Sequence, residues 1–234
     1  RTVDATGRKT DFDYDELNRR IQSIDNAGEE TSWTYDELGN LKSVTDRLQR
    51  TTSYDYDNLN RRIRITLPDP DGSGAQTAPT RSFGYDASGN LSWVKDERTF
   101  VTSFEYDKLN RQIKVIDALS GITVTEFDAV GNRIAVTDPL IRTTRFAYDN
   151  LNRLVASAVP DPAGSTDITK ALITVYSYDE VGDLVKTTDP LGHETSAGFD
   201  ALRRRVSVTD ANLKTTRYEY HAKGELKAVV DAAG

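Results

Sequence analysis

The sequence predicts an all-β fold, built as a tandem array of antiparallel β-hairpins. Three observations carry this prediction. One pattern recurs about every 21 residues, its strands alternate aromatic or apolar with polar residues, and Asp followed by Gly or Asn marks a turn in nearly every copy. A repeat of this length is typical of an array in which each unit packs against its neighbours. No segment combines a helical period with caps, so we expect no helices.

The repeat is clearest where an aromatic residue precedes Asp, as in "DFDYDELNRRIQSID" at residues 11–25. Successive copies are separated by 21, 21, 29, 21, 21, 21, 30, 21 and 21 residues. The copies start at Tyr14, Tyr35, Tyr56, Tyr85, Tyr106, Phe127, Tyr148, Tyr178, Phe199 and Tyr220. We therefore predict a single array over residues 1–234, with longer Pro- and Gly-containing loops near 67–81 and 159–173.

The first strand of each copy ends at this aromatic residue. Thr stands four residues before it in nine copies, and a second aromatic residue stands two before it in eight. The alternate positions, such as Asp11 and Asp13, are polar. Because side chains on a strand alternate between the two faces, we predict that one face is covered by aromatic rings and that the other is polar and exposed to solvent. The apolar content of 37% favours a thin or one-sided core.

A tight turn follows the aromatic residue. Its first position is Asp in nine copies: Asp15, Asp36, Asp57, Asp86, Asp107, Asp128, Asp149, Asp179 and Asp200. Its fourth position is Asn or Gly in nine copies, with Gly at Gly39, Gly89, Gly131, Gly182 and Gly224; Arg203 departs from this rule without an explanation in the sequence. Asn and Gly tolerate positive φ, so the pattern predicts a type I turn that closes into a bulge. We interpret the Asp as a cap whose carboxylate accepts backbone N–H groups.

A second strand follows, with Ile or Val seven residues past the aromatic residue in most copies. Eight copies then place an Asp eleven residues past it, and several of these begin a further turn, as in "DNAG" and "DPLG". Each repeat is therefore predicted to contain two short strands and two turns, about twenty strands altogether.

The turns alternate between "LNR" and "GN" copies for eight units. We expect successive hairpins to face unlike environments, such as opposite sides or rims of a sheet. The arginines that follow the "LNR" turns are expected to form ion-pair ladders between neighbouring hairpins. They are Arg19, Arg61, Arg111, Arg153 and Arg204.

Composition excludes several classes of partner and site. The net charge of −7 disfavours nucleic acid as a partner, and the absence of Cys excludes disulfides and thiolate metal sites. No apolar run approaches the roughly 18 residues that span a membrane as a helix. The chain begins in mid-pattern and contains no Met, so we expect it to be a piece of a longer protein.

No catalytic, cofactor or metal site is predicted. The recurring carboxylates occupy turn positions in every copy, whereas a catalytic site needs one unique constellation. "DPDGSG" matches the start of a calcium loop through Asp69, Asp71, Ser73 and Gly74, but Thr80 stands where the loop requires Glu. We interpret this segment as a Pro-rich turn and the chain as a non-enzyme.

The motifs "YDELGNLKSVTD", "YDNLNRRIRIT" and "TTRFAYDNLNRLV" closely resemble the YD repeats of Rhs (rearrangement hotspot) proteins. These repeats also occur in the B/C components of bacterial Tc toxins and in teneurins. The resemblance extends from about Val3 to Asp231. It implies a curved, spiralling sheet that is a segment of a hollow shell, and a bacterial delivery system that acts outside the producing cell. We transfer neither the self-cleavage nor the toxin activity of bacterial relatives, because ordinary repeats continue past "DPLG" at 189–192.

Two functions follow from this resemblance. The first is a structural shell of an Rhs-type polymorphic toxin that encloses and shields a C-terminal toxin cargo; its partners would be that cargo and further YD repeats of the same chain. The alternative is a carbohydrate- or protein-binding surface of a cell-surface YD-repeat protein, because aromatic rings stack on sugars as they do on bases. Exposed strand edges also predict self-association of this segment.

Overall fold

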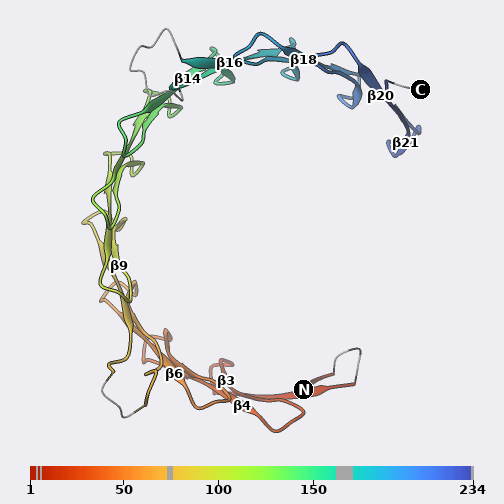
Figure 1. Ribbon diagram of the computed structural model, residues 1–234. Helices are drawn as coiled ribbons and strands as arrows, with labels where there is room; N and C mark the ends of the chain where they lie inside the picture. Colours follow the sequence, from red (N-terminus) through yellow and green to blue (C-terminus); the bar gives the residue numbers. More distant parts are fainter. Residues whose placement is uncertain (4, 6, 73–75, 162–170, 233–234) are drawn as a thin grey trace. The chain divides into compact units, whose positions relative to one another are not determined.

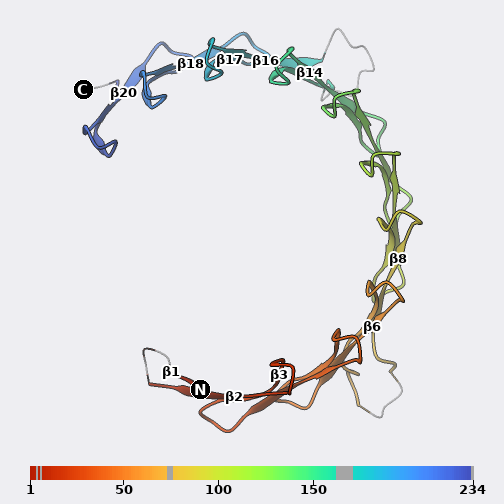
Figure 2. The ribbon, with the colours of Figure 1, turned by 180° about the vertical axis from the view of Figure 1, so that it is seen from behind.

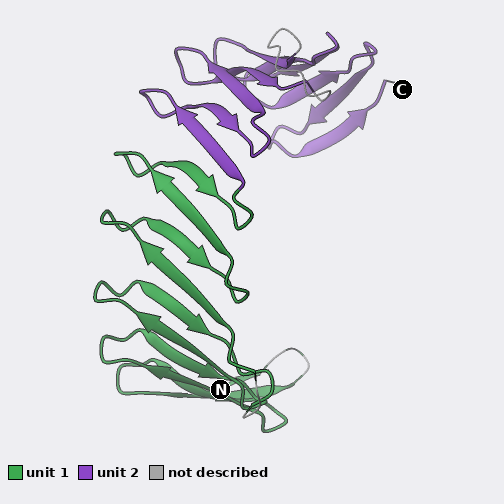
Figure 3. Cartoon of the chain, turned by 60° about the vertical axis from the view of Figure 1, so that its left-hand side comes forward, with its two compact units in different colours: residues 1–120 green, residues 121–234 purple. Residues whose placement is uncertain are grey.

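The computed structural model describes residues 1–3, 5, 7–72, 76–161 and 171–232. Every regular element in these ranges is a β-strand, which confirms the all-β, tandem-hairpin fold class (Figure 1). Ser73 and Gly74 of the "DPDGSG" segment, and residues 162–170 of the second long loop, lie outside the described residues. The chain divides into two compact units, residues 1–120 and 121–234 (Figure 3).

Unit 1 contains β1 to β11. Their bounds are β1 Thr2–Val3, β2 Lys9–Tyr14, β3 Arg20–Ile24, β4 Glu30–Tyr35, β5 Leu41–Thr45, β6 Thr51–Tyr56, β7 Arg62–Thr66, β8 Thr80–Tyr85, β9 Leu91–Lys95, β10 Val101–Tyr106 and β11 Gln112–Ile116. Each strand pairs antiparallel with the next one in the chain, so the unit is a meander of consecutive hairpins.

Unit 2 contains β12 to β21. Their bounds are β12 Ile122–Phe127, β13 Arg133–Thr137, β14 Thr143–Tyr148, β15 Leu154–Val159, β16 Leu172–Tyr178, β17 Leu184–Thr188, β18 Glu194–Phe199, β19 Arg205–Thr209, β20 Thr215–Tyr220 and β21 Leu226–Val230. The same antiparallel pairing of consecutive strands runs through this unit.

Each unit is a single layer of strands. In views from opposite sides, no second layer of described residues covers either face of a unit (Figures 1 and 2). Accordingly, Ala135 is the one apolar residue of the described chain that is fully buried, with 1% of its surface exposed. Stability must therefore come from contacts between neighbouring hairpins rather than from a central core.

The two kinds of turn lie on opposite rims of each sheet. The turn after each even-numbered strand begins at the Asp of the YD motif, and we call the rim formed by these turns the YD rim. The turn after most odd-numbered strands begins at the second Asp of the repeat and lies on the opposite rim. Since every YD turn of a unit follows a strand of the same direction, "LNR" and "GN" hairpins share one rim. The expectation that they face opposite sides or rims is wrong.

A bulge changes which side chains share a face. In β6 and β7 the register passes from Asp55 opposite Arg64 to Tyr56 opposite Arg62, leaving Ile63 without a partner. An extra residue in one strand reverses the alternation of side chains beyond it. The guanidinium carbon of Arg62 accordingly lies 5.8 Å from the ring centroid of Tyr54, on the ring-bearing face. The same register shift occurs in every YD hairpin, including those of Tyr35, Tyr106 and Tyr148.

The turns of the opposite rim hold large residues at positive φ. Their fourth positions include Gly28 and Gly192, as the sequence pattern leads one to expect, but also Ile141 at φ 63° and Thr99 at φ 70°. A β-branched side chain in this region crowds its own backbone. The sequence pattern missed these positions because their residue types do not favour the left-handed conformation.

Replacing Ile141 by Asn is expected to stabilise unit 2 by about 0.5–1 kcal/mol, because Asn tolerates positive φ and costs less strain. Ile141 is 85% exposed, so little buried apolar surface is lost. Thermal unfolding followed by circular dichroism should show a higher Tm for Ile141→Asn. Leu140→Asn, one residue earlier and 70% exposed, is the control and should leave the Tm unchanged. A lower Tm for Ile141→Asn would contradict the interpretation that Ile141 is strained at positive φ.

Candidate functional site

The YD turns are the most regular feature of the molecule. In the turn of Asp57, the Asn60 N–H donates to the Asp57 carbonyl at 3.0 Å, and the Asp57 N–H donates to the Arg61 carbonyl at 2.9 Å. Asn60 has φ 60°, as the type I turn with a bulge requires. The Asp57 Oδ1 accepts the N–H groups of Leu59 at 2.9 Å and of Arg61 at 3.0 Å. The aspartate therefore holds the turn closed through two backbone hydrogen bonds.

The sequence-derived repeat positions all occupy equivalent places. The ten aromatic residues are the last residues of β2, β4, β6, β8, β10, β12, β14, β16, β18 and β20. The nine aspartates each follow one of these strands directly. Gly39, Gly89, Gly131 and Gly182 adopt φ between 89° and 101° at the fourth position of their turns. These residues are dispersed along one rim of each unit, where Asp128, Tyr148 and Asp149 border an open hollow between two neighbouring turns.

The turn carboxylates are held in their charged form. The side-chain hydrogen bond from Arg61 holds the pKa of Asp57 below its ordinary value, and the Asn40 amide does the same for Asp36. In the turn of Asp15, the backbone N–H of Arg19 is the first cause of the lowered pKa. These carboxylates are half-buried acceptors tied to their own turns. This arrangement is typical of turn caps rather than of groups that transfer protons.

Seven of the YD tyrosines tie their hairpin to the preceding one. The Tyr35 hydroxyl donates to the carbonyl of Arg20 at 3.0 Å, and the Tyr56 hydroxyl donates to that of Leu41 at 3.0 Å. The acceptor is always the first residue of the preceding odd-numbered strand. The same bond is made by Tyr85, Tyr106, Tyr148, Tyr178 and Tyr220. Burial raises the pKa of Tyr56, which keeps this hydroxyl a donor. At these positions the tyrosine hydroxyls are thus used within the sheet.

Removing the hydroxyl of Tyr56 is expected to destabilise unit 1 by about 0.5–1.5 kcal/mol, the usual net value of one hydrogen bond. Tyr56→Phe should nevertheless fold, because Phe199 ends the equivalent strand β18. Urea denaturation followed by circular dichroism would measure the loss. The reverse change, Phe199→Tyr, is the matched control and should raise the stability of unit 2 by a similar amount. Equal stability of both variants and the wild type would refute a role for the tyrosine bonds.

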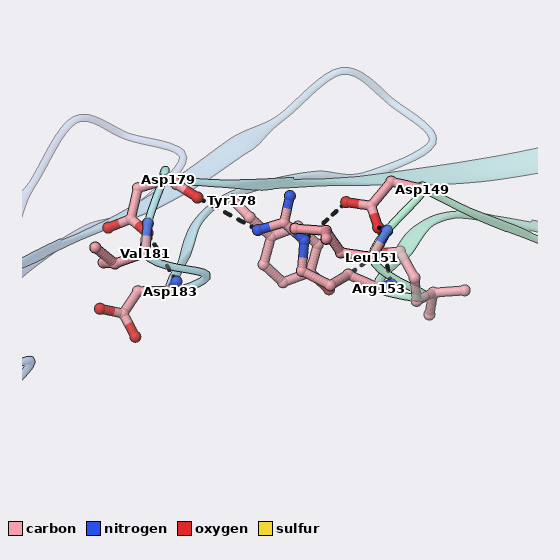
Figure 4. Close-up of polar contacts among 8 residues, drawn as sticks. Asp149, Leu151, Arg153, Tyr178, Asp179, Val181 and Asp183 are labelled. Carbon is pink, nitrogen blue, oxygen red and sulfur yellow. Dashed lines mark hydrogen bonds and ion pairs between the residues drawn. The ribbon is translucent and has the colours of Figure 1, made fainter.

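The arginines of the "LNR" turns act between neighbouring hairpins by stacking. Arg153 Nε forms an ion pair with Asp149 of its own turn at 2.7 Å, while its guanidinium carbon lies 4.7 Å from the ring centroid of Tyr178 in the next YD hairpin. Its Nη1 also donates to the Asp179 carbonyl at 3.3 Å (Figure 4). Arg19, Arg61 and Arg204 stack in the same way on Tyr35, Tyr85 and Tyr220. The predicted ion-pair ladder between hairpins is therefore wrong: the ion pairs, including that of Arg111, close within each turn.

The "GN" turns make a different link. The Asn40 Nδ2 donates to Asp36 Oδ2 in its own turn and to Asn60 Oδ1 in the next YD turn, both at 3.0 Å. Asn90 and Asn132 form equivalent bonds to Asn110 and Asn152. The "LNR"-type turns of Arg19, Arg61, Arg153 and Arg204 thus contact the next YD turn of their unit through Arg on Tyr. The "GN" turns of Asn40, Asn90 and Asn132 do so through Asn on Asn. The alternation in the sequence is an alternation of these two links.

Arg203 stands where the other YD turns have Asn or Gly, and a second exception in the preceding YD turn explains it. Asp183 stands where the other "GN" turns have Asn, and its Oδ1 lies 2.6 Å from Arg203 Nη2. Arg203 keeps the positive φ of the turn, at 60°. An ion pair therefore replaces the Asn–Asn hydrogen bond between these two hairpins. The signal in the sequence was the occurrence of two departures in adjacent copies.

The two faces of each sheet differ in chemistry. One face carries the rings two residues before each YD tyrosine, together with Arg20, whose guanidinium carbon lies 4.0 Å from the Trp33 ring centroid. The other face carries polar pairs, such as Asp55 with Arg64 at 2.6 Å. The rings on the first face are half-buried by their neighbours, as expected for packing within one layer.

The described residues hold no further candidate site. No group of three or more His, Asp or Glu side chains among them could hold a metal ion. The "DPLG" segment forms an ordinary turn, in which the Gly192 N–H donates to the Asp189 carbonyl at 3.0 Å. A search of the described ranges also finds no helix with the length and apolar character needed to cross a membrane.

This fold and these turns define a single-layer protein of tandem β-hairpin repeats. A family model described as "RHS Repeat" matches residues 35–73, 85–122, 127–166 and 178–215, which is more than half of the chain. The chain belongs to the RHS repeat family. No curated protein matches the sequence.

Crystal structures of TcdB2-TccC3 have a similar fold. The crystal structure of TcdB2-TccC3 aligns over 98% of this chain and 15% of its own, with 16% sequence identity and a TM-score of 0.67. That of TcdB2-TccC3-TEV aligns over 96% of this chain and 14% of its own, with 15% identity and a TM-score of 0.67. The likeness concerns the fold, and the chain spans about one seventh of those chains. It is thus an RHS repeat segment whose fold matches part of the TcdB2-TccC3 structures.

Proposed function

We propose that this segment is part of the wall of a shell that encloses and shields a polypeptide cargo. In this proposal, residues 1–234 act as one repeat array, without enzymatic activity, cofactor or metal. The observation that carries it is the single-layer sheet in which every YD hairpin is linked to the next within its unit. The described part of this sheet has two open faces, and the hollow bordered by Asp128, Tyr148 and Asp149 is open to solvent, which suits a barrier better than a catalyst. Membership of the RHS repeat family supports the same function.

The mechanism of this wall is steric exclusion. Backbone ladders, Tyr hydroxyl bonds and the Arg and Asn links distribute stability over all hairpins, so that no single core has to be completed. We further propose that the partners are the enclosed cargo and further repeats of the parent chain, and that the parent protein acts outside the cell that makes it.

Protease accessibility tests this function in the parent protein. A TEV protease site is placed in the polypeptide that follows the repeats, and a second site replaces residues 76–79, in a loop outside the strands. We expect the loop site to be cleaved rapidly, and the cargo site only after mild denaturant or acid opens the shell. Cleavage of both sites at the same rate in the native protein would refute enclosure.

A further inference from the structure

The YD rim of unit 1 displays a row of leucines at its most exposed points. Leu17, Leu38 and Leu59 are each 71% exposed, and Leu109 is 68% exposed. All four occupy the third position of a YD turn, where only the backbone N–H is used, as a donor to the Asp carboxylate. Large apolar side chains held out into solvent in a regular row point to a contact surface.

The turn itself does not require an apolar side chain at this position. In the turn that begins at Asp86, Ser88 takes the third place and its N–H donates to Asp86 Oδ1 at 2.9 Å. The Gly89 N–H donates to the Asp86 carbonyl at 3.0 Å, as in the leucine-bearing turns. Lys223 holds the same place in the turn that begins at His221. Ser and Lys fit this turn position as well as Leu does, so the geometry of the turn does not account for the leucines. A contact outside the turn explains them.

The size and period of this rim match an interface with a second, identical rim. Unit 1 has five YD turns of five residues each, at 15–19, 36–40, 57–61, 86–90 and 107–111. That number of residues falls within the roughly 20–30 that each side contributes to a standard protein interface. The turns recur every second strand, about 9–10 Å apart. Because two copies of the same rim have the same spacing between turns, several leucines of one copy can contact the other copy at the same time.

Charge selects the antiparallel orientation of the two rims. At the second position of the five turns stand Glu16, Glu37, Asn58, Ala87 and Lys108, all of which are exposed. When one rim is reversed against the other about the central turn, Glu16 faces Lys108 at both ends, and Glu37 faces Ala87. In a parallel alignment Glu16 would face Glu16 and Glu37 would face Glu37. At this position the antiparallel arrangement thus gains two opposite-charge pairs and brings no like charges together. The Asp and Arg of the "LNR" turns are already paired within each turn.

We propose that the YD rim of unit 1 is a homodimer interface with a two-fold axis through the turn of Leu59. In this dimer, Leu59 packs on Leu59 of the second copy, Leu17 on Leu109, and Leu38 on Ser88. A two-fold axis normal to the sheet at this turn reverses the direction of the rim and keeps the curvature of the unit, so the two rims stay in contact along their length. The contact is made by turns and leaves the strand edges unpaired. It is distinct from pairing between exposed strands.

Cysteine cross-linking tests the axis. The chain contains no Cys, so a single introduced thiol can pair only with its copy. Leu59→Cys lies on the proposed axis and is expected to give a disulfide-linked dimer on mild oxidation, because the two Cα atoms can approach to disulfide distance. Leu38→Cys on the same rim and Leu48→Cys on the opposite rim should stay monomeric on denaturing gels. Equal cross-linking of all three, or none at position 59, would overturn the proposal.

Sedimentation velocity tests the energetic basis of the interface. The wild-type chain is expected to show a concentration-dependent monomer–dimer equilibrium. Leu59→Ser with Leu109→Ser should raise the dissociation constant at least tenfold without changing the circular dichroism spectrum, because Ser88 already occupies an equivalent turn. The same double change on the opposite rim, Leu48→Ser with Leu119→Ser, should have no effect.

The charge pairs give a test of orientation. Glu16→Lys and Lys108→Glu should each weaken the dimer, and the double variant Glu16→Lys/Lys108→Glu should restore it. A wild-type chain that is monomeric at all concentrations, a dimer insensitive to the leucine changes, or a double charge variant weaker than both single variants would each refute the antiparallel rim contact.

Discussion

Acidification to below about pH 4 is expected to unfold both units, with little change in Tm between about pH 7 and pH 5. The capping aspartates have pKa values below the ordinary 3.8, which means that the folded chain binds their protons less tightly than the unfolded chain does. Their stabilisation is therefore fully present above the ordinary pKa and is lost as the pH falls through the lower folded values. The other carboxylates of this kind are Asp15, Asp36, Asp46, Asp86, Asp128, Asp138, Asp149 and Asp189.

The effect should be large because Asp begins the YD turn in nine of the ten repeats. Thermal unfolding at a series of pH values, followed by circular dichroism, would measure it. The matched control is Asp57→Asn with Asp107→Asn, since Asn keeps an oxygen that can accept the turn N–H groups but has no charge to lose. This variant should have a lower Tm at neutral pH and a smaller fall in Tm on acidification. A Tm that stays constant down to about pH 2 would contradict the capping role.

Gly84→Ala is expected to destabilise unit 1 by about 1–3 kcal/mol, the usual cost of overpacking. Gly84 lies directly opposite Trp93 in the β8–β9 pair, and the indole ring of Trp93 crosses the backbone of Gly84. A methyl group on residue 84 would overlap this ring and force it away from the sheet. Urea denaturation would measure the loss of stability. Tryptophan fluorescence in a Trp33→Phe background would report the displacement of Trp93.

A double-mutant cycle isolates this contact from the general effect of the substitution. In a Trp93→Ala background the obstacle is absent, and Gly84→Ala should be neutral or stabilising, because Ala loses less backbone entropy on folding than Gly does. Gly198→Ala provides a second control: its added methyl group would meet chiefly the Ser207 hydroxyl, which can rotate away. If Gly84→Ala cost the same with and without Trp93, the ring contact would not be the cause.

Most of the fold could be predicted from sequence because it follows from two short-range patterns. These are the alternation of side chains along each strand and the spacing of residues within each turn. Alternation at every second residue predicts a strand such as Thr52, Tyr54 and Tyr56, and Asp57 followed by Asn60 predicts the turn. The bulge was also predicted, but not its consequence that Arg62 lies on the ring-bearing face. That consequence depends on the register of two strands, and register is a property of the pair.

The links between hairpins could not be predicted in the same way. The sequence showed that "LNR" and "GN" copies alternate, but not that Arg153 stacks on Tyr178 while Asn40 binds Asn60. Each contact joins residues 20 or more positions apart. Which side chains meet at that separation depends on the position of one hairpin against the next.

The amino-acid sequence by itself determined where the strands and turns lie, which turns need Asp, Asn or Gly, and that the chain is a repeat array of the RHS type. These properties follow from alternation and backbone preference within about 21 residues. The tertiary structure alone decided which face Arg62 occupies, why Arg203 pairs with Asp183, and why Ile141 accepts a positive φ. In these cases the surrounding sheet imposes a geometry that the residue's own conformational preference does not predict.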